Sequence, residues 1–473
     1  MRPLVLVVLV ACGGAAVDPI SQLEDPSTCK SCHPQHFAQW SESMHAYASV
    51  DPVFIAMNKR GQRETDNQLG TFCVQCHAPM AVALKLTDGT DYDPTMLTAA
   101  TNGVTCYFCH NVDKVVDTHN NGLQIALDQT MRGGLANPTA TPAHHSKDDP
   151  LMVSESNDSS MCGSCHDIVN GHGVAIERTF KEWQTTFFTE SDPLHHLTCG
   201  GCHMRSSTGQ VADPSTGAPV RQFGIHEHLW QGIDQAVTDG FPGGSDLATE
   251  IQGDLDPAIG VVGATPISGP PSPGGICVDQ GNGGEITVRV DSIGVGHAWP
   301  SGSSQDRRAW LELTAFDGSG SAVFSTGVVP DGMDPEQIAD PNLLAWYDRA
   351  LGSDGQPAHM FWDIASETSP CASQLPCLLK PPTTLNPNDP AFDHSSTKIF
   401  VVGALAGSIQ TIQAQIHIRP YSFATLSDLV QSGDLDSAVV ARVPTLDIAG
   451  TQRVWDRATA GTGAAINTGC SPQ

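Results

Sequence analysis

CKSCH at Cys29–His33 is the first of five copies of one pattern, Cys-x-x-Cys-His. The others are CVQCH at Cys73–His77, CYFCH at Cys106–His110, CGSCH at Cys162–His166 and CGGCH at Cys199–His203. In this pattern the two thiols add across the vinyl groups of a porphyrin, and the adjacent histidine becomes the proximal iron ligand. The sequence therefore predicts five covalently attached haem c groups. The thiols are those of Cys29, Cys32, Cys73, Cys76, Cys106, Cys109, Cys162, Cys165, Cys199 and Cys202, and the proximal ligands are His33, His77, His110, His166 and His203.

Two other uses of paired cysteines fit the pattern less well. A zinc site needs two such pairs, or one pair and two histidines, and does not require histidine after the second cysteine every time. Thioredoxin-like redox motifs come singly, in a βαβ setting that this chain lacks. Haem attachment is therefore the interpretation of all five copies, and movement of electrons is the expected task of the chain.

The composition limits the partners. The 473 residues carry 51 acidic and 23 basic side chains, a net charge of −28, to which the haem propionates would add. Nucleic acid and anionic membrane surfaces are poor partners for such a chain, whereas a cationic redox partner would be steered towards it. Abundant glycine (46) and proline (33) suit a loop-rich chain wrapped around cofactors.

The first residues, MRPLVLVVLVAC, predict export. One arginine and a short apolar run end in Leu9-Val10-Ala11-Cys12, which resembles a bacterial lipoprotein box. The prediction is a signal peptide at 1–11, a lipid anchor on Cys12 and a tether at 12–28. Gly13 after this cysteine is not the aspartate that signals retention, which favours the outer membrane. The predicted location is the outer membrane, the periplasm or the cell surface. The alternative is an ordinary secretory signal in which Cys12 is incidental.

Four cysteines remain after the haem thiols and Cys12, and all lie beyond the last haem motif. In an oxidising compartment an even set is expected to form two disulfides. Three pairings are possible, and we favour Cys371–Cys377 and Cys277–Cys470.

The haem motifs define a helix-and-loop domain at 29–233 that wraps its cofactors. Helices are predicted at 36–45, where Phe37, Trp40 and Met44 share a face, and at 177–187 on the same kind of pattern. A Gly/Pro-rich linker is predicted at 234–284.

A mainly-β, sandwich-like domain is predicted at 285–473. Alternating or apolar runs mark its candidate strands, and the stretch at 330–395 is expected to be irregular. The predicted strands are 286–290, 309–316, 399–402 and 412–419.

Fourteen further histidines compete for at most five distal positions on the irons. His45 follows the first predicted helix and is a candidate, as is one of His144 and His145. One of His226 and His228 is also a candidate. His297, in a tight turn after a strand, would make the β-rich domain contribute a distal ligand, and His172 is a weaker candidate. The remaining ones are read as loop, edge or polar-face residues: His36, His119, His195, His196, His359, His394 and His417.

These landmarks together resemble the family of bacterial multihaem c-type cytochromes related to the tetrahaem cytochrome that serves hydroxylamine oxidoreductase in nitrifying bacteria. The likeness runs from about residue 29 to 302, and the haem motifs carry most of its specificity. The matching elements are Trp40-x-x-Ser43-x-His45, Gly103-Val104-x-Cys106, His144-x-Ser146, CGSCHD at 162–167, Glu182-Trp183, Cys202-His203-Met204, His228-x-Trp230-x-Gly232 and GHAWPSG at 296–302.

The resemblance implies a haem-wrapping helical region followed by a β-rich domain, and electron transfer as the activity. It favours His144 over His145 and His228 over His226, and it adds support for His297. Only four distal histidines are then well supported, so the fifth haem has His172, another ligand or none. The chain has no CxxCK motif, as pentahaem nitrite reductases have, and no tyrosine that resembles a hydroxylamine oxidoreductase crosslink.

Three functions follow for comparison. The first is electron transfer from a quinol-oxidising or periplasmic donor to a terminal reductase, an extracellular acceptor or another cytochrome. Assembly with other cytochromes is possible. The second is an oxidoreductase that acts on a small nitrogen or sulfur species at one haem without a distal ligand. The third, a surface protein with structural haems, is disfavoured because five haems are too many for structure alone.

Overall fold

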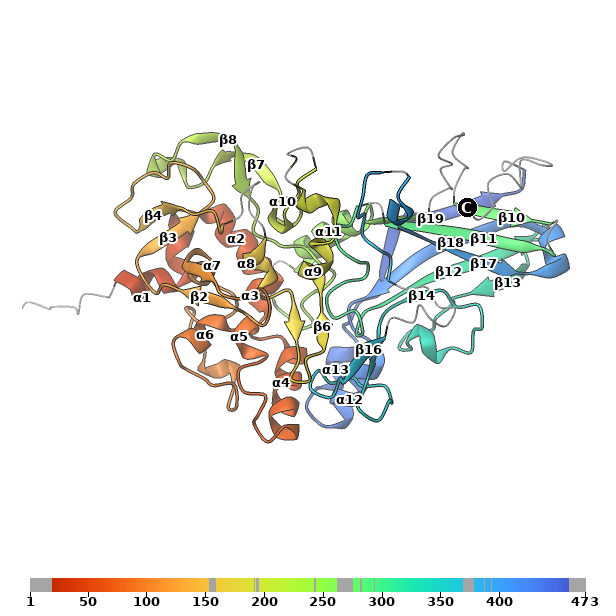
Figure 1. The fold of residues 1–473 in the computed structure, drawn as a ribbon, viewed down its shortest axis with the longest axis horizontal. Helices are drawn as coiled ribbons and strands as arrows, with labels where there is room; N and C mark the ends of the chain where they lie inside the picture. Colours follow the sequence, from red (N-terminus) through yellow and green to blue (C-terminus); the bar gives the residue numbers. More distant parts are fainter. Residues whose placement is uncertain are drawn as a thin grey trace, which may run out of the picture.

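The computed structural model describes residues 19–152, 159–190, 192, 195–241, 244–261, 275–280, 283–292, 294–368, 378–386, 388–392 and 394–458. A helical N-terminal part and a β-rich C-terminal part lie side by side (Figure 1). At this level the expected fold class is confirmed. The predicted signal peptide, Cys12 and the cysteines at 371, 377 and 470 lie outside the described residues.

The haem motifs fold into single helical turns. The first lies in and just after η1 (Pro26–Ser31), and the others lie at α5 (Val74–His77), α7 (Cys106–His110), α8 (Ser160–Gly163) and α10 (Cys199–His203). The amide of His33 donates to the carbonyl of Cys29 at 2.7 Å, and His166 donates to Cys162 in the same way at 3.0 Å. Residues i, i+3 and i+4 of a helical turn share one face, so both thiols and the imidazole of each motif point to the same side.

Other helices surround these turns: α1 (Pro19–Glu24), α2 (Pro34–Glu42), α3 (Met44–Tyr47), α4 (Pro52–Glu64), α6 (Pro79–Ala83) and α9 (Thr179–Trp183). Residues 19–28, predicted as part of a tether, form α1 and the start of η1, and Leu23 is buried against Tyr107 and Phe108. An apolar anchor therefore docks this stretch onto α7.

Both predicted helices are shorter in the structure. The helix predicted at 36–45 is split at Ser43, whose hydroxyl donates to the Trp40 carbonyl and caps the start of α3. The helix predicted at 177–187 is reduced to α9. Glu177 belongs to strand β6 (Ala175–Glu177), and at the other end the Thr186 hydroxyl donates to the Trp183 carbonyl. Side chains that bond to the nearby backbone compete with continued helix.

The C-terminal part packs two antiparallel sheets face to face. One has the order β10-β11-β17 with β9 also on β11, and the other has the order β13-β12-β18-β19 with β14 on β12. Inward side chains from both sheets, such as Val288 and Leu311, form one buried core, as expected of a sandwich. The strands are β9 (Ile259–Val261), β10 (Ile276–Asp279), β11 (Glu285–Ser292), β12 (Arg308–Asp317), β13 (Ala322–Thr326), β14 (Ala345–Trp346), β17 (Ser395–Val401), β18 (Ile409–Arg419) and β19 (Leu446–Asp456).

The stretch predicted as a linker, 234–284, is partly built into this sandwich. It forms α11 (Gly244–Leu255), β9 and β10. Leu247, Ile251 and Leu255 recur every four residues and are buried, which makes a stripe that the many glycines and prolines hid. Cys277 in β10 is disulfide-bonded, and the pairing we favour for it stays a prediction.

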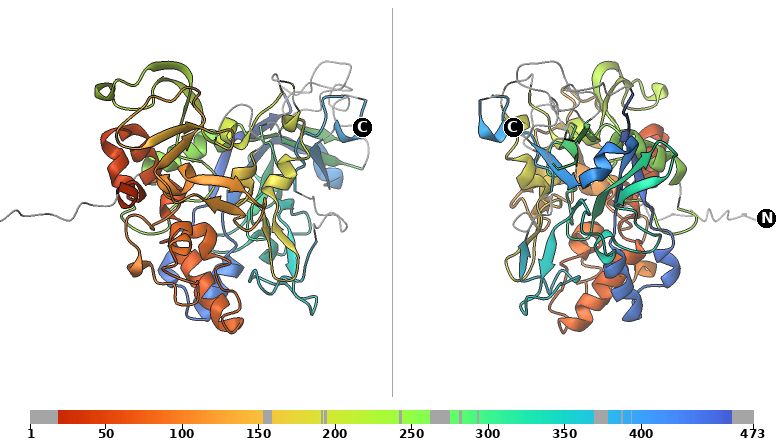
Figure 2. Two further views of the ribbon diagram at one scale, coloured as in Figure 1. Left: turned by 60° about the vertical axis from the view of Figure 1, so that its left-hand side comes forward. Right: turned by 90° about the vertical axis from the view of Figure 1, so that its right-hand side faces the viewer.

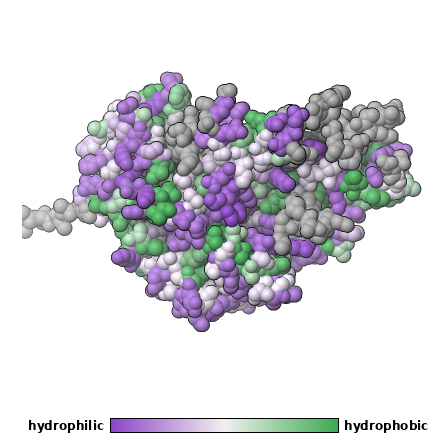
Figure 3. Space-filling view, viewed as in Figure 1, coloured by the Kyte–Doolittle hydropathy of each residue, from purple (hydrophilic) through white to green (hydrophobic). Residues whose placement is uncertain are grey.

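The two parts are joined by helices that return from the β-rich part. α12 (Phe423–Gln431) and α13 (Ser437–Val440) lie beside α4 at the lower edge of the molecule (Figures 1 and 2). Leu426 and Leu429 pack with Val53 and Met57, and Arg63 donates two hydrogen bonds to Asp434. The surface seen in Figure 3 is mainly hydrophilic with small apolar patches over both parts. No helix in the described ranges is long and apolar enough to cross a membrane.

Candidate haem-binding sites

We number the motifs in chain order as site 1 (Cys29–His33), site 2 (Cys73–His77), site 3 (Cys106–His110), site 4 (Cys162–His166) and site 5 (Cys199–His203). In four of them the proximal imidazole donates from Nδ1 to a main-chain carbonyl. The pairs are His33 with Val211 at 2.7 Å, His77 with Ala48 at 3.1 Å, His110 with Arg132 at 2.5 Å and His203 with Gln231 at 2.8 Å. A hydrogen bond at Nδ1 fixes the tautomer and leaves Nε2 as the iron ligand. The residues therefore fit a haem at these sites.

Three proximal imidazoles each face a second histidine. The ring centroids are 6.3 Å apart for His166 and His45, 6.3 Å for His110 and His228, and 6.4 Å for His203 and His297. An imidazole nitrogen binds a metal at about 2.0 Å and lies about 1.15 Å from its ring centroid, so two rings on one iron have centroids about 6.3 Å apart. The spacing in all three pairs is that of two axial ligands.

The facing histidines are held as ligands are held. His228 donates from Nδ1 to the carbonyl of His226 at 2.9 Å, and His297 donates to that of Ala298 at 2.8 Å. The carbonyl of His45 accepts from the amide of Val104 at 2.8 Å. A Cβ on Gly103 would lie 2.6 Å from that carbonyl, which explains the glycine in the Gly103-Val104 element.

Site 1 lies near His144. This histidine interacts electrostatically with His33, and its Nδ1 donates to the carbonyl of His145 at 3.2 Å. His145 is exposed and His144 is partly buried, so the structure brings His144 rather than its neighbour towards the motif.

Site 2 differs from the others. The ring placed against His77 is that of Phe54, stacked at 4.2 Å with 2° between the planes. His172 is exposed, in the turn after β5 (Ile168–Val169), where its amide donates to Asn170. Among the described residues we therefore find no histidine pair at site 2 like those at sites 3, 4 and 5.

Thiols of different motifs lie close enough to interact, and these contacts order the sites in space. Cys29 contacts Cys106, Cys76 contacts Cys165, and Cys162 contacts Cys199. Cys109 and Cys165 also interact electrostatically. Site 3 is thus next to sites 1 and 4, and site 4 is next to sites 2, 3 and 5.

The turn that carries His297 is anchored to the N-terminal part by Glu182 in α9. The carboxylate accepts from the amide of Ala298 at 3.2 Å and from the hydroxyl of Ser301 at 2.6 Å. Burial raises the pKa of Glu182 to about 7, against the effect of these two hydrogen bonds. The Thr179 hydroxyl accepts from the amide of Gly302 at 3.0 Å. Glu182 belongs to the Glu182-Trp183 element of the family resemblance, but nothing in the sequence indicated that it anchors the turn of His297.

The remaining histidines lie elsewhere. His226 donates to the carbonyl of Met204 at 2.6 Å, and the His36 ring contacts that of His228. Others face carboxylates: His119 faces Asp117, His195 faces Glu190, His359 faces Asp428, His394 faces Asp291 and His417 faces Asp447. The Trp230 ring, part of the His228-x-Trp230-x-Gly232 element, contacts those of His45 and His228. Nothing in the sequence pointed to Phe54.

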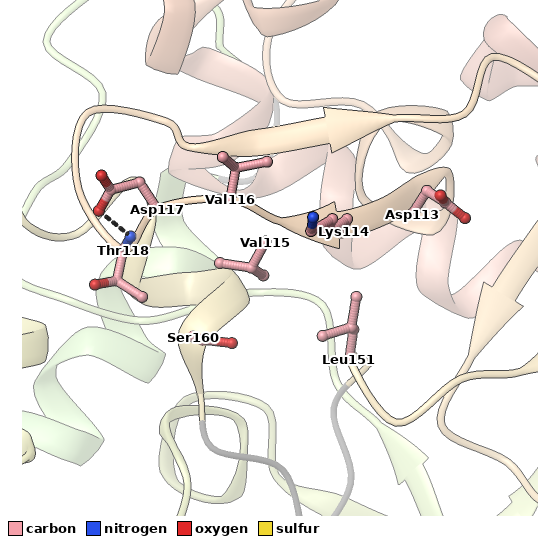
Figure 4. A pocket seen from close by; sticks show the side chains of 8 residues that line it. All are labelled: Asp113, Lys114, Val115, Val116, Asp117, Thr118, Leu151 and Ser160. Atoms are coloured by element: carbon pink, nitrogen blue, oxygen red, sulfur yellow. Dashed lines mark hydrogen bonds between the residues drawn. The ribbon is translucent and has the colours of Figure 1, made fainter.

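A surface cavity of about 470 Å³ lies beside the segments that follow site 3 and precede site 4. It is lined by strand β1 (Val112–Val115) and the turn that follows it, by Leu151 and by Ser160 at the start of α8 (Figure 4). None of its described lining residues is a motif cysteine or histidine, so it is not one of the haem sites.

Comparisons with known proteins agree with this geometry. The model of the cytochrome c554 and c-prime family matches residues 28–111, which hold sites 1 to 3. No curated protein matches the chain. A penta-haem cytochrome c552 from Thermochromatium tepidum has a similar structure, with a TM-score of 0.57 and 18% identity, over 92% of this chain and 99% of that one. At this identity the likeness shows a common fold. With the repeated motif, these findings support a multihaem c-type cytochrome.

Proposed function

We propose that the chain transfers electrons through five haem c groups, attached at sites 1 to 5. The proposed axial pairs are His33 with His144 at site 1, His110 with His228 at site 3, His166 with His45 at site 4, and His203 with His297 at site 5. The spacing of the three facing imidazole pairs, at sites 3, 4 and 5, is the observation that carries this proposal. Two imidazoles on one iron leave no position for a substrate and keep the iron low-spin in both oxidation states.

The order of the sites gives a route. Thiol contacts place site 1 beside site 3, site 3 beside site 4, and site 4 beside sites 2 and 5. Electrons would pass along sites 1, 3, 4 and 5, with site 2 as a branch. The exposed Cys202 of site 5 favours electron exchange with a partner at that end.

A second function is favoured by site 2 alone. His77 packs against Phe54, and His172 lies in an exposed turn. A haem with one protein ligand would bind a small nitrogen or sulfur species, which makes the chain an oxidoreductase whose other haems supply or remove electrons. In the alternative, His172 moves to the iron as its distal ligand, and the haem of site 2 is six-coordinate like the others.

Spectroscopy of the oxidised holoprotein separates these functions. We expect EPR and optical spectra dominated by low-spin haem, with mass spectrometry giving the haem count. If cyanide, nitrite and hydroxylamine leave every haem unchanged, the oxidoreductase function is excluded. A single high-spin haem whose spectrum shifts when one of these ligands binds would instead support the second function, catalysis at site 2. A mass that corresponds to fewer than five haems would contradict the proposed cofactor content.

The remaining parts of the proposal concern place and partners. We propose an exported protein, anchored through lipid on Cys12 at the outer membrane or cell surface, whose partners are cationic redox proteins and other cytochromes. We also propose that it belongs with the cytochromes related to the electron acceptor of hydroxylamine oxidoreductase. Release of the protein from membranes by substitution of Cys12 with serine, with unchanged haem content, is expected. A variant that fractionates with membranes as before would contradict the anchor.

A further inference from the structure

Site 4 differs from the other sites at its proximal histidine. The Nδ1 atoms of the other four imidazoles donate to neutral main-chain carbonyls. His166 instead faces a carboxylate, with 3.6 Å between its Nδ1 and Oε1 of Glu177. We propose that Glu177 tunes the haem of site 4, lowering its reduction potential below the value that a carbonyl partner would give. This inference rests on the proposed haem attachment and electron transfer.

The local fold places Glu177 next to this imidazole. Strand β5 begins two residues after His166, and its first residue, Ile168, pairs with Glu177, the last residue of β6. The hairpin that follows the haem motif therefore returns the carboxylate to the histidine of the same motif. The side chain of Glu177 is 18% exposed, so water screens its charge only in part.

Neighbouring cations leave this carboxylate free to act on His166. Arg307 interacts electrostatically with Glu177. However, its guanidinium donates to both carboxylate oxygens of Asp234, at 2.6 and 2.9 Å. Arg178 lies 3.5 Å from Asp167. Each of these arginines thus has a carboxylate partner of its own.

The physical effect follows from charge. A carboxylate beside Nδ1–H draws the proton and increases the electron density on the imidazole, which makes it a more basic ligand. A more basic, more negative ligand stabilises ferric over ferrous iron, and second-shell hydrogen bonding is one of the levers that set haem potential. A main-chain carbonyl is neutral and has a smaller effect.

Site 4 lies between the other sites, so its reduction potential would affect electron flow through the whole chain. Its thiols contact those of sites 2 and 5 and interact with site 3. On the proposed route every electron that passes from site 3 to site 5 crosses site 4. A low potential at this site would make it the point where reduction of the chain is hardest, so Glu177 would set the driving force that a donor must supply.

The test is a redox titration of the full-length holoprotein, followed optically and by EPR, for wild type and Glu177→Gln. Glutamine keeps the size and an acceptor oxygen but removes the charge. We expect one haem to shift to higher potential by a factor of ten or more in its redox equilibrium, which is 59 mV for a one-electron couple. The EPR signal of the same haem should change, whereas the other four should move less.

The matched control is Glu312→Gln. Glu312 also faces an imidazole, with 3.4 Å to Nε2 of His417, but lies in β12, away from the haem motifs. The Glu312→Gln variant removes the same charge and is expected to leave all reduction potentials unchanged.

Equal shifts in both variants, or no shift in Glu177→Gln, would overturn the role of Glu177. Wild-type haem content and redox activity are measured first, so a failure of the proposed function is seen separately. If Glu177→Gln loses haem, Glu177→Asp, which keeps the charge, should restore both haem and potential, and failure to do so would also overturn it.

Discussion

At the scale of single residues, His297 is a proposed ligand that comes from a distant part of the chain. It follows a strand of the β-rich part, yet its ring lies 6.4 Å from that of His203 with 9° between the planes. On the proposed ligation, we expect His297→Ala to leave the iron of site 5 with one protein ligand, so that one more haem than in the wild type becomes high-spin. Optical and EPR spectra of the oxidised protein would show this change, and cyanide should then bind.

The control for this variant is His417→Ala. His417 also belongs to the β-rich part, but its ring faces Asp447 at 2.7 Å and Glu312. Its removal is expected to leave the spin state of every haem as it is in the wild type. If His297→Ala also leaves all spin states as in the wild type, another group binds the iron of site 5.

The haem-attachment residues could be predicted from the sequence, whereas the histidine that faces each proximal ligand could not. The proximal histidines follow from a local pattern, because the two thiols and the imidazole occupy one helical turn. The pairing of His228 with site 3 or of His45 with site 4 depends on contacts between segments more than a hundred residues apart. Glu177 carried no signal at all, since only the β5–β6 pairing brings it to His166.

At the scale of elements, the start of α4 holds a buried carboxylate. Asp51 caps this helix by accepting from the amide of Val53 at 3.0 Å, and it is 7% exposed. Burial raises the pKa of Asp51 to about 7 from an ordinary value of 3.8. The folded chain therefore holds a proton that the unfolded chain releases, and the stability from this group is lost as the pH rises from about 4 to about 7.

Asp51→Asn keeps a capping oxygen and removes the titration. We expect it to stabilise the protein by about 3 kcal/mol at about pH 8 and to change little at about pH 4, measured by urea unfolding. Asp93→Asn is the matched control, because Asp93 also precedes a proline and caps a helical turn but is exposed, and hydrogen bonds lower its pKa. It should lack the gain at high pH. The same pH dependence in wild type and Asp51→Asn would rule out Asp51 as its source.

Elements were predictable where periodicity was clean. Alternation at 286–290 and 412–419 corresponds to β11 and β18, whose inward residues are buried. The break at Ser43 in the helix predicted at 36–45 was not predicted, because a serine can lie on the polar face of a helix as well as at its cap. The stretch at 234–284 was predicted as a linker because of its many glycines, although the spacing of Leu247, Ile251 and Leu255 is that of a helix.

At the scale of the whole molecule, net charge is expected to select the reagents that approach the proposed haems. The chain carries a net charge of −28, and the surface in Figure 3 spreads hydrophilic residues over both parts. Such a field attracts cations and repels anions over distances of about 10 Å at 0.1 M salt. We therefore expect the reduced protein to be oxidised faster by hexaamminecobalt(III), relative to its driving force, than by ferricyanide.

Salt separates this field from the intrinsic reactivity of each oxidant. Raising the ionic strength from about 0.01 M to about 0.15 M shortens the screening length from about 30 Å to about 8 Å, so the rate with the cation should fall several-fold while the rate with ferricyanide rises. Stopped-flow oxidation at several salt concentrations measures both slopes. Opposite signs would place the reacting haem edge within the negative field, as a cationic protein partner requires. If both rates were independent of salt, the exposed haem edge would lie on a locally neutral face, and net charge would not select the partner.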